Sequence, residues 1–227
     1  PALEGIGKSL ATHIAKCAGV SDRKLGDIES DIKSLNAKSF PVLDDARGEE
    51  MAQRILKARE EADSVGGVTE TVICGTPAGV GEPWFDSVES IISHAAFSLG
   101  GVKGIEFGAG FAVADMRGSE CNDPLRVSGG RIVTTTNNNG GINGGITNGM
   151  PIIFRCAVKP TPSIAQTQDT VDFIKNENTQ LSIHGRHDPA IIRRICPVLD
   201  SVAALCVADM LSLRYGTDVL TKGVDDK

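Results

Sequence analysis

Residues 137–163 read NNNGGINGGITNGMPIIFRCAVKPTPS. A loop rich in Gly and Asn leads into an apolar run, Ile152 to Val158, which predicts a buried strand that ends at the segment 159–163. Glycine allows positive φ and close approach to a flat ligand, and the ammonium and two hydroxyl groups of 159–163 suit a phosphate. The two halves therefore suggest one ligand site. The alternative is a disordered loop followed by an ordinary strand.

Composition narrows the class of protein. The 227 residues are enough for one large domain or two small ones, and we expect a single domain over 1–227. A net charge of −6 argues against a nucleic-acid groove. Six cysteines without C-x-x-C spacing indicate reduced thiols of a cytoplasmic protein, and the histidines lack metal-ligand spacing, so no metal site is expected.

Targeting and membrane signals are not recognisable. We predict no signal peptide and no uninterrupted membrane span, because the most apolar stretch, 197–213, contains Asp200 and Asp209 and is typical of a core or interface helix. The chain opens without an initiator methionine, which suggests a fragment.

Helical periodicity predicts four helices. The first covers 3–17, where Ile6, Leu10, Ile14 and Cys17 recur at helical spacing. The second runs from Asp44 or Asp45 to residue 64. The third opens at Pro83 and continues to residue 99. The fourth runs from about residue 188 to 215, with Asp188 as N-cap, Pro189 in the first turn and a kink or break at Pro197.

Strands are expected between these helices. The sequence predicts strands at 68–76, 151–158 and 181–183, and a hairpin of 104–107 with 111–116. The aperiodic stretch 117–149 is either functional or mobile, and 22–36 and 164–178 give no clear pattern. Because several strands are linked by hairpins, an α+β fold is favoured over a parallel α/β fold.

The densest polar cluster is His184-Gly-Arg-His-Asp-Pro189, placed at a predicted helix N-terminus that favours an anion. Arg186 suits a phosphate or carboxylate, whereas Asp188 is either a base or a helix cap. The phosphate candidates are Lys159, Thr161, Ser163 and Arg186, with Pro160 and Pro162 stiffening the loop.

Other polar residues leave two interpretations open. His13 and His94 are expected to be structural. His184 and His187 either protonate a ligand or are solvated neighbours of Arg186. Ser119, Asn122 and Asp123 either bind a polar ligand or only make a turn. No Walker P-loop and no Gly-x-Ser-x-Gly motif is present.

Seven motifs resemble, in order, those of one family. They are 62–67 ADSVGG, 75–86 GTPAGVGEPWFD, 102–108 VKGIEFG, 118–119 GS, 140–146 GGINGGI, 159–163 KPTPS and 185–189 GRHDP. The family is chorismate synthase, and the resemblance covers about residues 4 to 215. It implies a β-α-β sandwich, with a helical layer between two antiparallel sheets, assembled as a homotetramer.

The resemblance also implies a reaction on a small phosphorylated substrate, without nucleic acid or membrane. 5-Enolpyruvylshikimate 3-phosphate loses phosphate and a ring hydrogen in a 1,4-anti elimination that gives chorismate, in the shikimate pathway of aromatic amino acid biosynthesis. The family needs reduced FMN without net redox change, and the flavin is thought to lend an electron and take it back. Whether NADPH reduces the flavin on the enzyme itself is left open.

The site residues follow from the same resemblance. Segment 159–163 and Arg186 should contact FMN or the substrate phosphate, and Gly144 should lie against the flavin. Gly101 falls on another flavin-contact position. Asp188 matches an acidic residue implicated in handling a flavin proton.

The family's two proton-donating histidines and several substrate arginines lie upstream of the first residues here. The resemblance therefore implies a chain with about two thirds of the enzyme. The alternative function is a core that binds FMN weakly, forms oligomers and does not turn over.

Overall fold

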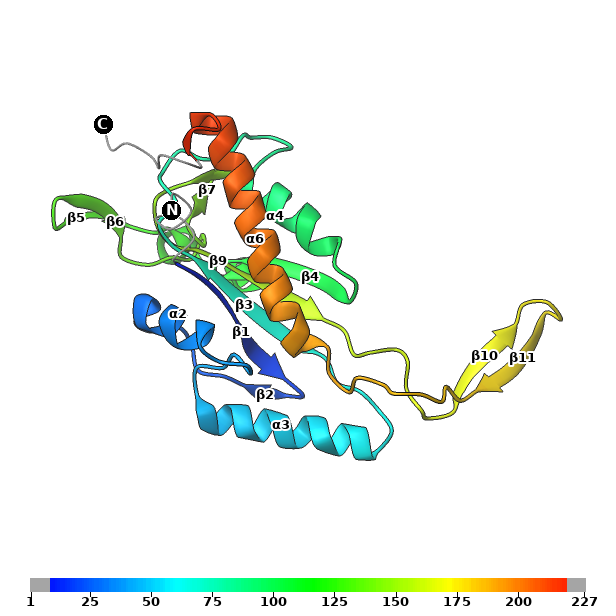
Figure 1. Cartoon of the computed structure of the whole chain (residues 1–227). Coiled ribbons are helices and arrows are strands. Elements are labelled where there is room, and N and C mark those ends of the chain that lie inside the picture. Colours follow the sequence, from blue (N-terminus) through cyan, green and yellow to red (C-terminus); the bar gives the residue numbers. More distant parts are fainter. Residues whose placement is uncertain (1–8, 220–227) are drawn as a thin grey trace.

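The computed structural model describes residues 9–219. At its centre is a five-stranded antiparallel sheet in the order β2-β1-β3-β9-β4 (Figure 1). Its strands are β1 (Leu10–Cys17), β2 (Val20–Ser21), β3 (Gly67–Ile73), β4 (Val102–Phe107) and β9 (Ile152–Val158). Three separate hairpins are β5 (Leu125–Ser128) with β6 (Arg131–Thr134), β7 (Ile142–Asn143) with β8 (Ile146–Thr147), and β10 (Gln168–Asp172) with β11 (Glu177–Leu181). The helices are α2 (Ile28–Asn36), α3 (Asp45–Glu60), α4 (Val88–Phe97), α5 (Gly118–Cys121), α6 (Ile192–Tyr215) and the 3-10 helix η1 (Gly110–Asp115).

Helices cover the sheet unequally. The long helix α6 crosses β1 and β3 and packs beside α4, with the larger hydrophobic core beneath them (Figure 1). A smaller core beneath α2 contains Ala11 and Val72, from the opposite face of the sheet. The α+β class and the antiparallel pairing are thus confirmed. Over residues 9–219 the helical layer covers one sheet, and the other strands form only two-stranded hairpins.

The strand predicted at 151–158 is confirmed as β9, paired with β3 on one side and β4 on the other. Phe154 and Cys156 point into the larger core, whereas Arg155 points to the opposite face. The predicted helix from Asp45 and the strand from 68 are also confirmed, as α3 and β3. Asp44 caps α3 by accepting from the backbone N–H of Ala46 at 2.9 Å.

The helix predicted over 3–17 is wrong where the structure describes it, because Leu10–Cys17 is the strand β1. A spacing of four residues fits one face of a strand as well as one face of a helix, so Leu10 and Ile14 share the larger core. A β-bulge between Ile14 and Lys16 then returns Cys17 to that same face. Residues 3–8 lie outside the described part of the chain.

The strand predicted at 111–116 is also wrong, because these residues form η1. The carboxylate of Glu106 accepts from the N–H of Phe111 at 3.0 Å, and Gly110 has φ +59°, so the chain turns where a hairpin was expected. The short strand expected at 181–183 is displaced and lies at β11.

The stretch 117–149 contains α5 and two hairpins, and Asp123 organises it. The Asp123 carboxylate accepts from the N–H groups of Asn138 and Asn139 and from the hydroxyl of Thr136. Burial raises the pKa of Asp123, but these hydrogen bonds outweigh burial and lower it. The carboxylate is therefore engaged within the chain, which favours the turn interpretation of Asp123 over a ligand-binding role.

Helix α4 begins later than predicted, at Val88 instead of Pro83. The hydroxyl of Ser87 accepts from the N–H of Ser90 at 3.1 Å and caps the helix. We expect Ser87→Ala to lower the free energy of unfolding by about 1 kcal/mol in urea titrations. The control is Ser201→Ala, because this exposed hydroxyl bonds only the Pro197 carbonyl in its own helix. Equal losses in the two variants would contradict the capping role.

Helix α6 begins at Ile192, so the predicted cap at Asp188 and first turn at Pro189 are wrong. Pro197 lies inside α6 and does not split it. No membrane span was expected from the sequence, but by length and hydropathy alone α6 is able to cross a membrane. It packs on the sheet and supplies much of the larger core, as predicted for a core helix.

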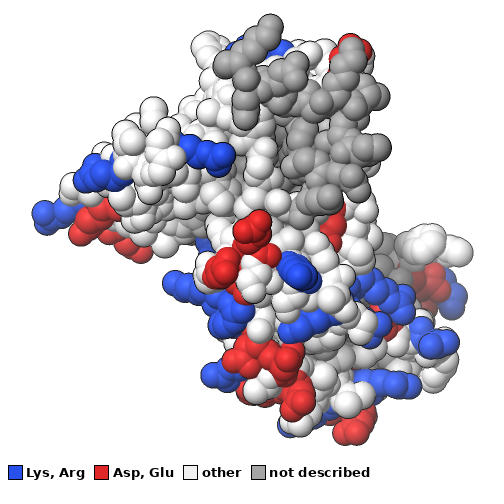
Figure 2. Space-filling model, turned by 60° about the vertical axis from the view of Figure 1, so that its left-hand side comes forward, with Lys and Arg blue, Asp and Glu red and all other residues white. Residues whose placement is uncertain are grey.

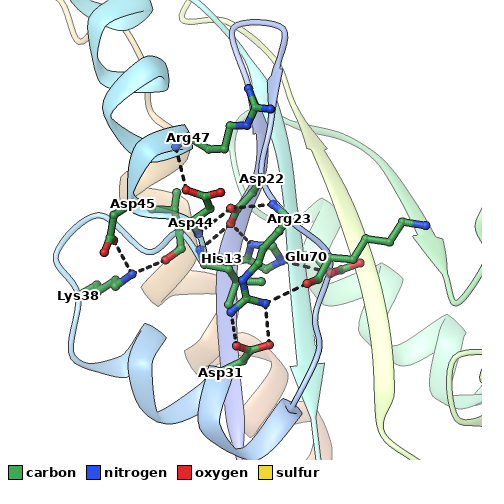
Figure 3. Close-up of polar contacts among 12 residues, drawn as sticks. His13, Asp22, Arg23, Asp31, Lys38, Asp44, Asp45, Arg47 and Glu70 are labelled. Atoms are coloured by element: carbon green, nitrogen blue, oxygen red, sulfur yellow. Dashed lines mark hydrogen bonds and ion pairs between the residues drawn. The ribbon is translucent and has the colours of Figure 1, made fainter.

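Ionisable side chains cross the sheet face opposite α6. Asp22 bonds His13 at 2.9 Å, and the other ring nitrogen of His13 lies 3.2 Å from Glu70 (Figure 3). Arg155 lies beyond Glu70 and pairs with Glu106 at 2.9 Å. Burial lowers the pKa of His13, but the hydrogen bonds to Asp22 and Glu70 outweigh burial and raise it. His13 is structural, as predicted, although it lies in a strand.

Candidate functional site

The loop that follows β9 is held between two other loops. The N–H of Lys159 donates to the carbonyl of Gly101 at 2.9 Å. The hydroxyl of Ser64 donates to the carbonyl of Thr161 at 2.6 Å, and the N–H of Val65 donates to the carbonyl of Pro189 at 2.8 Å. The KPTPS and GRHDP segments therefore meet at the turn after α3, as the proposed phosphate site requires.

A cavity of about 210 Å³ lies at this meeting point. It is lined by Arg59, Ala62, Asp63, Ile164, Ala165, Gly185, Arg186, His187 and Pro189. Neither guanidinium group, of Arg59 or of Arg186, has a hydrogen-bond or ion-pair partner within residues 9–219. Two guanidinium groups with free N–H donors are suited to a phosphate.

Arg59 was not foreseen as a site residue. It lies in the last turn of α3, where basic residues are common because they complement the helix dipole. The sequence gives no sign that this turn faces Arg186. Only the packing of the 62–66 turn against Pro189 brings the two together.

Ser163 and His187 are joined directly. The hydroxyl oxygen of Ser163 lies 2.9 Å from Nδ1 of His187, and Nε2 of His187 lies 2.9 Å from the carbonyl oxygen of Ile183. Of the two interpretations of His187, the structure favours a residue built into the site. His187 lines the cavity beside Arg186.

The remaining residues of the KPTPS segment differ in their surroundings. The side chain of Lys159 is exposed and is not part of the cavity wall. The hydroxyl of Thr161 is buried, and within the described chain it has no hydrogen-bond partner. A buried hydroxyl without a partner is costly and marks a place where a ligand or water completes the bonding.

Asp188 faces a different cavity from Arg186. Its carboxylate accepts from the N–H of Ala190 at 3.2 Å and pairs with Nε of Arg194 at 3.1 Å. This second cavity, of about 390 Å³, also contains Arg193 and the apolar side chains Phe40, Ile55 and Leu56. Asp188 is thus held by α6, although it does not cap that helix.

The two candidate glycines lie apart. Gly101 lies beside Lys159 and has φ +101°, which residues with a side chain rarely adopt, so the backbone conformation favours glycine. A Cβ there would meet the end of the Ile191 side chain at 2.7 Å. Gly144 lies in the β7–β8 turn, near the start of β9, where a Cβ would meet no atom within 4 Å. Seven residues of β9 separate this end from Lys159, which is about 20 Å. The two halves of the 137–163 segment therefore do not form one local site within this chain.

Asp200 is a half-buried acid of α6 that lines a third cavity, together with Arg193 and Arg194. Its Oδ1 has no hydrogen-bond partner among the described residues, and burial raises its pKa to about 6. The native state thus favours the neutral acid. The contribution of Asp200 to the free energy of unfolding is fully present below the unfolded pKa of about 3.8, and it is lost as pH rises through about 6.

We expect Asp200→Asn to remove that pH dependence. In urea titrations, the free energy of unfolding of the wild-type protein should fall by on the order of 1 kcal/mol or more between pH values of about 4 and 6. That of the variant should not change over this range. Asp209→Asn, on the exposed side of the same helix, is the control. An unchanged slope in Asp200→Asn would refute the assignment.

Metal chemistry finds no support in the described residues, because no group of three or more His, Cys, Asp or Glu side chains over 9–219 is placed to hold an ion. The six cysteines are all free, as expected. On the face that Figure 2 shows, acidic and basic side chains are interspersed and form no continuous basic stripe.

Comparison with known proteins decides the family. A family model described as chorismate synthase matches residues 2–212. The chain belongs to the chorismate synthase family. Chorismate synthase of Methanosarcina acetivorans is 44% identical over 214 residues, which cover 94% of this chain and 58% of that protein. The chorismate synthase of Korarchaeum cryptofilum is 50% identical over 166 residues, covering 72% of this chain and 46% of the relative.

A solved structure agrees with these sequences. It is titled "Crystal Structure of Chorismate Synthase" and matches with a TM-score of 0.74 at 25% identity, over 92% of this chain and 58% of that one. The fold expected from the chorismate synthase motifs is thereby confirmed. The chain spans about three fifths of the length of the Methanosarcina chorismate synthases and of this solved structure.

Proposed function

We propose that this chain is the greater part of a chorismate synthase, a lyase that eliminates phosphate from 5-enolpyruvylshikimate 3-phosphate and uses reduced FMN. The observation that carries the proposal is the cavity between Arg59 and Arg186, which is lined by residues of the GRHDP motif and by Ile164 and Ala165, directly after the KPTPS segment. Membership of the family supports an enzyme of the lyase type. The guanidinium groups of Arg59 and Arg186, which have no partner in the described chain, are available to bind a phosphate.

The residues present fit the phosphate end of FMN. Arg186 offers two parallel N–H donors, Ser163 offers a hydroxyl, and the buried hydroxyl of Thr161 still needs a partner. A flavin bound there supplies the electron density for the elimination and is regained unchanged. Contacts of its ring with Gly101 and Gly144 stay predictions.

The chain's own residues hold and orient in this scheme. Arg186 neutralises and positions the phosphate in the cavity, and the exposed ammonium of Lys159, outside the cavity wall, adds positive charge nearby. Asp188 holds or releases a proton near the flavin, and Arg194 fixes the orientation of its carboxylate. Arg186 and Asp188 line neighbouring cavities, which suits one group for phosphate and another for the proton.

We also propose a cytoplasmic homotetramer. The β10–β11 hairpin projects from the body of the chain (Figure 1) and exposes Val171, Phe173 and Ile174. Clustered exposed apolar side chains are typical of protein interfaces. These exposed side chains support the proposed oligomer, because the projecting hairpin presents them away from the rest of the chain.

The alternative is a core that binds FMN or phosphate and does not turn over. It is favoured by the length of the relatives, of which this chain covers about three fifths. In that case the same Arg59–Arg186 cavity binds the anion, and the chemistry needs residues that the matched segment does not contain.

The test is a titration of oxidised FMN into the 227-residue chain, with and without the enolpyruvyl substrate, read by flavin fluorescence and thermal shift. Riboflavin, which lacks the phosphate, is the matched ligand control. Saturable FMN binding with chorismate formation after flavin reduction supports the lyase. FMN binding without turnover supports the alternative, and absence of FMN binding contradicts a flavin site in this chain.

A further inference from the structure

The ring of His187 is bonded at both nitrogens. Nε2 lies 2.9 Å from the carbonyl oxygen of Ile183, and Nδ1 lies 2.9 Å from the hydroxyl oxygen of Ser163. A carbonyl oxygen only accepts, so Nε2 carries a proton. In the neutral ring Nδ1 is then a lone pair, and the single hydroxyl proton of Ser163 must point at it.

This arrangement conflicts with the role proposed for Ser163. A phosphate has only acceptor oxygens at neutral pH, and it needs a donor from Ser163. Ser163 does not itself line the cavity, but it bonds His187, which does. While the hydroxyl proton is given to neutral His187, Ser163 has only lone pairs left for an anion bound beside that ring. Binding therefore requires either loss of the Ser163–His187 bond or a second proton on the ring.

We propose that His187 is a positioning residue that takes up a proton when an anion binds, and so turns the Ser163 hydroxyl from His187 toward the anion. The inference rests on the proposed phosphate site. The proton comes from solvent and goes to Nδ1, which then donates to the Ser163 oxygen. The Ser163 proton donates to the anion, and Nε2–H keeps its bond to Ile183, so that every donor has an acceptor.

The surroundings of His187 suit this exchange. Arg59, Asp63 and Arg186 line the same cavity, Lys159 lies in the Ser163 loop, and Asp188 is held by Arg194. The neighbouring carboxylate of Asp188 already has its own cation. A dianion brings negative charge into the cavity, which favours one more positive charge on the wall it faces.

Isothermal titration calorimetry measures the number of protons that the protein takes up when FMN binds. FMN is titrated into the full 227-residue chain at about pH 8, where a free imidazole is neutral, in buffers that differ in ionisation enthalpy. We expect uptake of about one proton per FMN bound and, by linkage, an FMN affinity that falls as pH rises. Riboflavin should take up none.

Two variants separate positioning from a merely structural role. In His187→Asn the amide is able to donate to Ser163 without titrating, so FMN should bind with no proton uptake and with affinity independent of pH. In Ser163→Ala, which removes the hydroxyl, uptake should also fall toward zero. Proton uptake equal to wild type in His187→Asn would overturn the proposal, and thermal unfolding of each variant establishes that it is folded.

Sulfate provides a test that does not depend on flavin. In ¹⁵N-labelled protein, the His187 Nδ1 signal should report a lone pair at about pH 8 and move toward the protonated value when sulfate is added, but not in Ser163→Ala. If sulfate gives this change and FMN does not bind, the flavin proposal fails and this inference holds. If FMN binds without proton uptake, the inference fails and the flavin proposal holds.

Discussion

Replacing Asp22 with alanine is expected to lower the free energy of unfolding by about 3–5 kcal/mol, the loss typical of removing one partner from a buried charged pair. The Asp22 side chain is fully buried, and it accepts from the N–H groups of Leu43 at 2.6 Å and Asp44 at 2.9 Å as well as from His13 (Figure 3). The variant leaves His13 buried beside Glu70 alone, and it leaves two N–H groups of the strand-to-helix connection without an acceptor.

Urea titration at neutral pH measures this loss, and Asp45→Ala is the matched control. Asp45 also pairs with a cation, Lys38 at 2.7 Å, but its side chain is 83% exposed, so its loss should cost less than about 1 kcal/mol. Comparable losses in the two variants would show that burial does not set the strength of the Asp22 contacts.

The contribution of Asp22 to stability should depend on pH, and the direction follows from the shift of its pKa. Burial raises the pKa of Asp22, but the bonds from His13 and from the backbone outweigh burial and lower it. Stability from Asp22 is therefore present above the unfolded pKa of about 3.8 and lost as pH falls through the lower native value. The difference in free energy of unfolding between wild type and Asp22→Ala should therefore narrow as pH falls into strong acid.

Replacing Arg186 with alanine is expected to weaken FMN binding by about 10- to 150-fold. Hydrogen bonds to charged groups contribute about 1.5–3 kcal/mol, and each 1.4 kcal/mol is a factor of ten in affinity. Arg186 lines the cavity and is free of partners in the described chain, so its loss should leave the fold intact. Any residual affinity for riboflavin should not change, because riboflavin has no phosphate.

Arg186→Lys and Arg47→Ala complete this experiment, read by flavin fluorescence. Lysine keeps the charge without the planar pair of donors, so it should restore only part of the affinity. Arg47 lies near the start of α3 and pairs with Glu50, away from the cavity, so its removal should not affect FMN. Unchanged FMN affinity in Arg186→Ala would remove this residue from the phosphate site.

Several elements were predictable because the local pattern and the tertiary packing agree. The strand β9 is apolar and bounded by Pro151 and Pro160, and α3 has an N-cap and a stop before Gly66. The apolar spacing of β1 was misleading, since positions four residues apart share a face in both a helix and a strand. Only pairing with β3, with a bulge after Ile14, decides between them.

The candidate site was also predictable only in part: the chemistry of its residues follows from the sequence, and their contacts do not. The types of residue in 159–163 and 185–189 indicate an anion, since hydroxyl, ammonium and guanidinium groups have that chemistry wherever they lie. Sequence order carries no sign that Arg59 faces Arg186, or that Ser163 bonds His187 across 24 residues. Those contacts depend on loops that meet only after the sheet has formed.

The sequence by itself determined the α+β class, the buried strand β9, the chemistry of the two motif loops and the resemblance to one family. Local periodicity and side-chain chemistry are properties of short segments, so they can be recognised before folding. The tertiary structure alone decided that β1 is a strand, that Asp188 pairs with Arg194, and that Gly144 lies a strand's length from Lys159. Each of these depends on which distant segment packs alongside, and no local pattern encodes that.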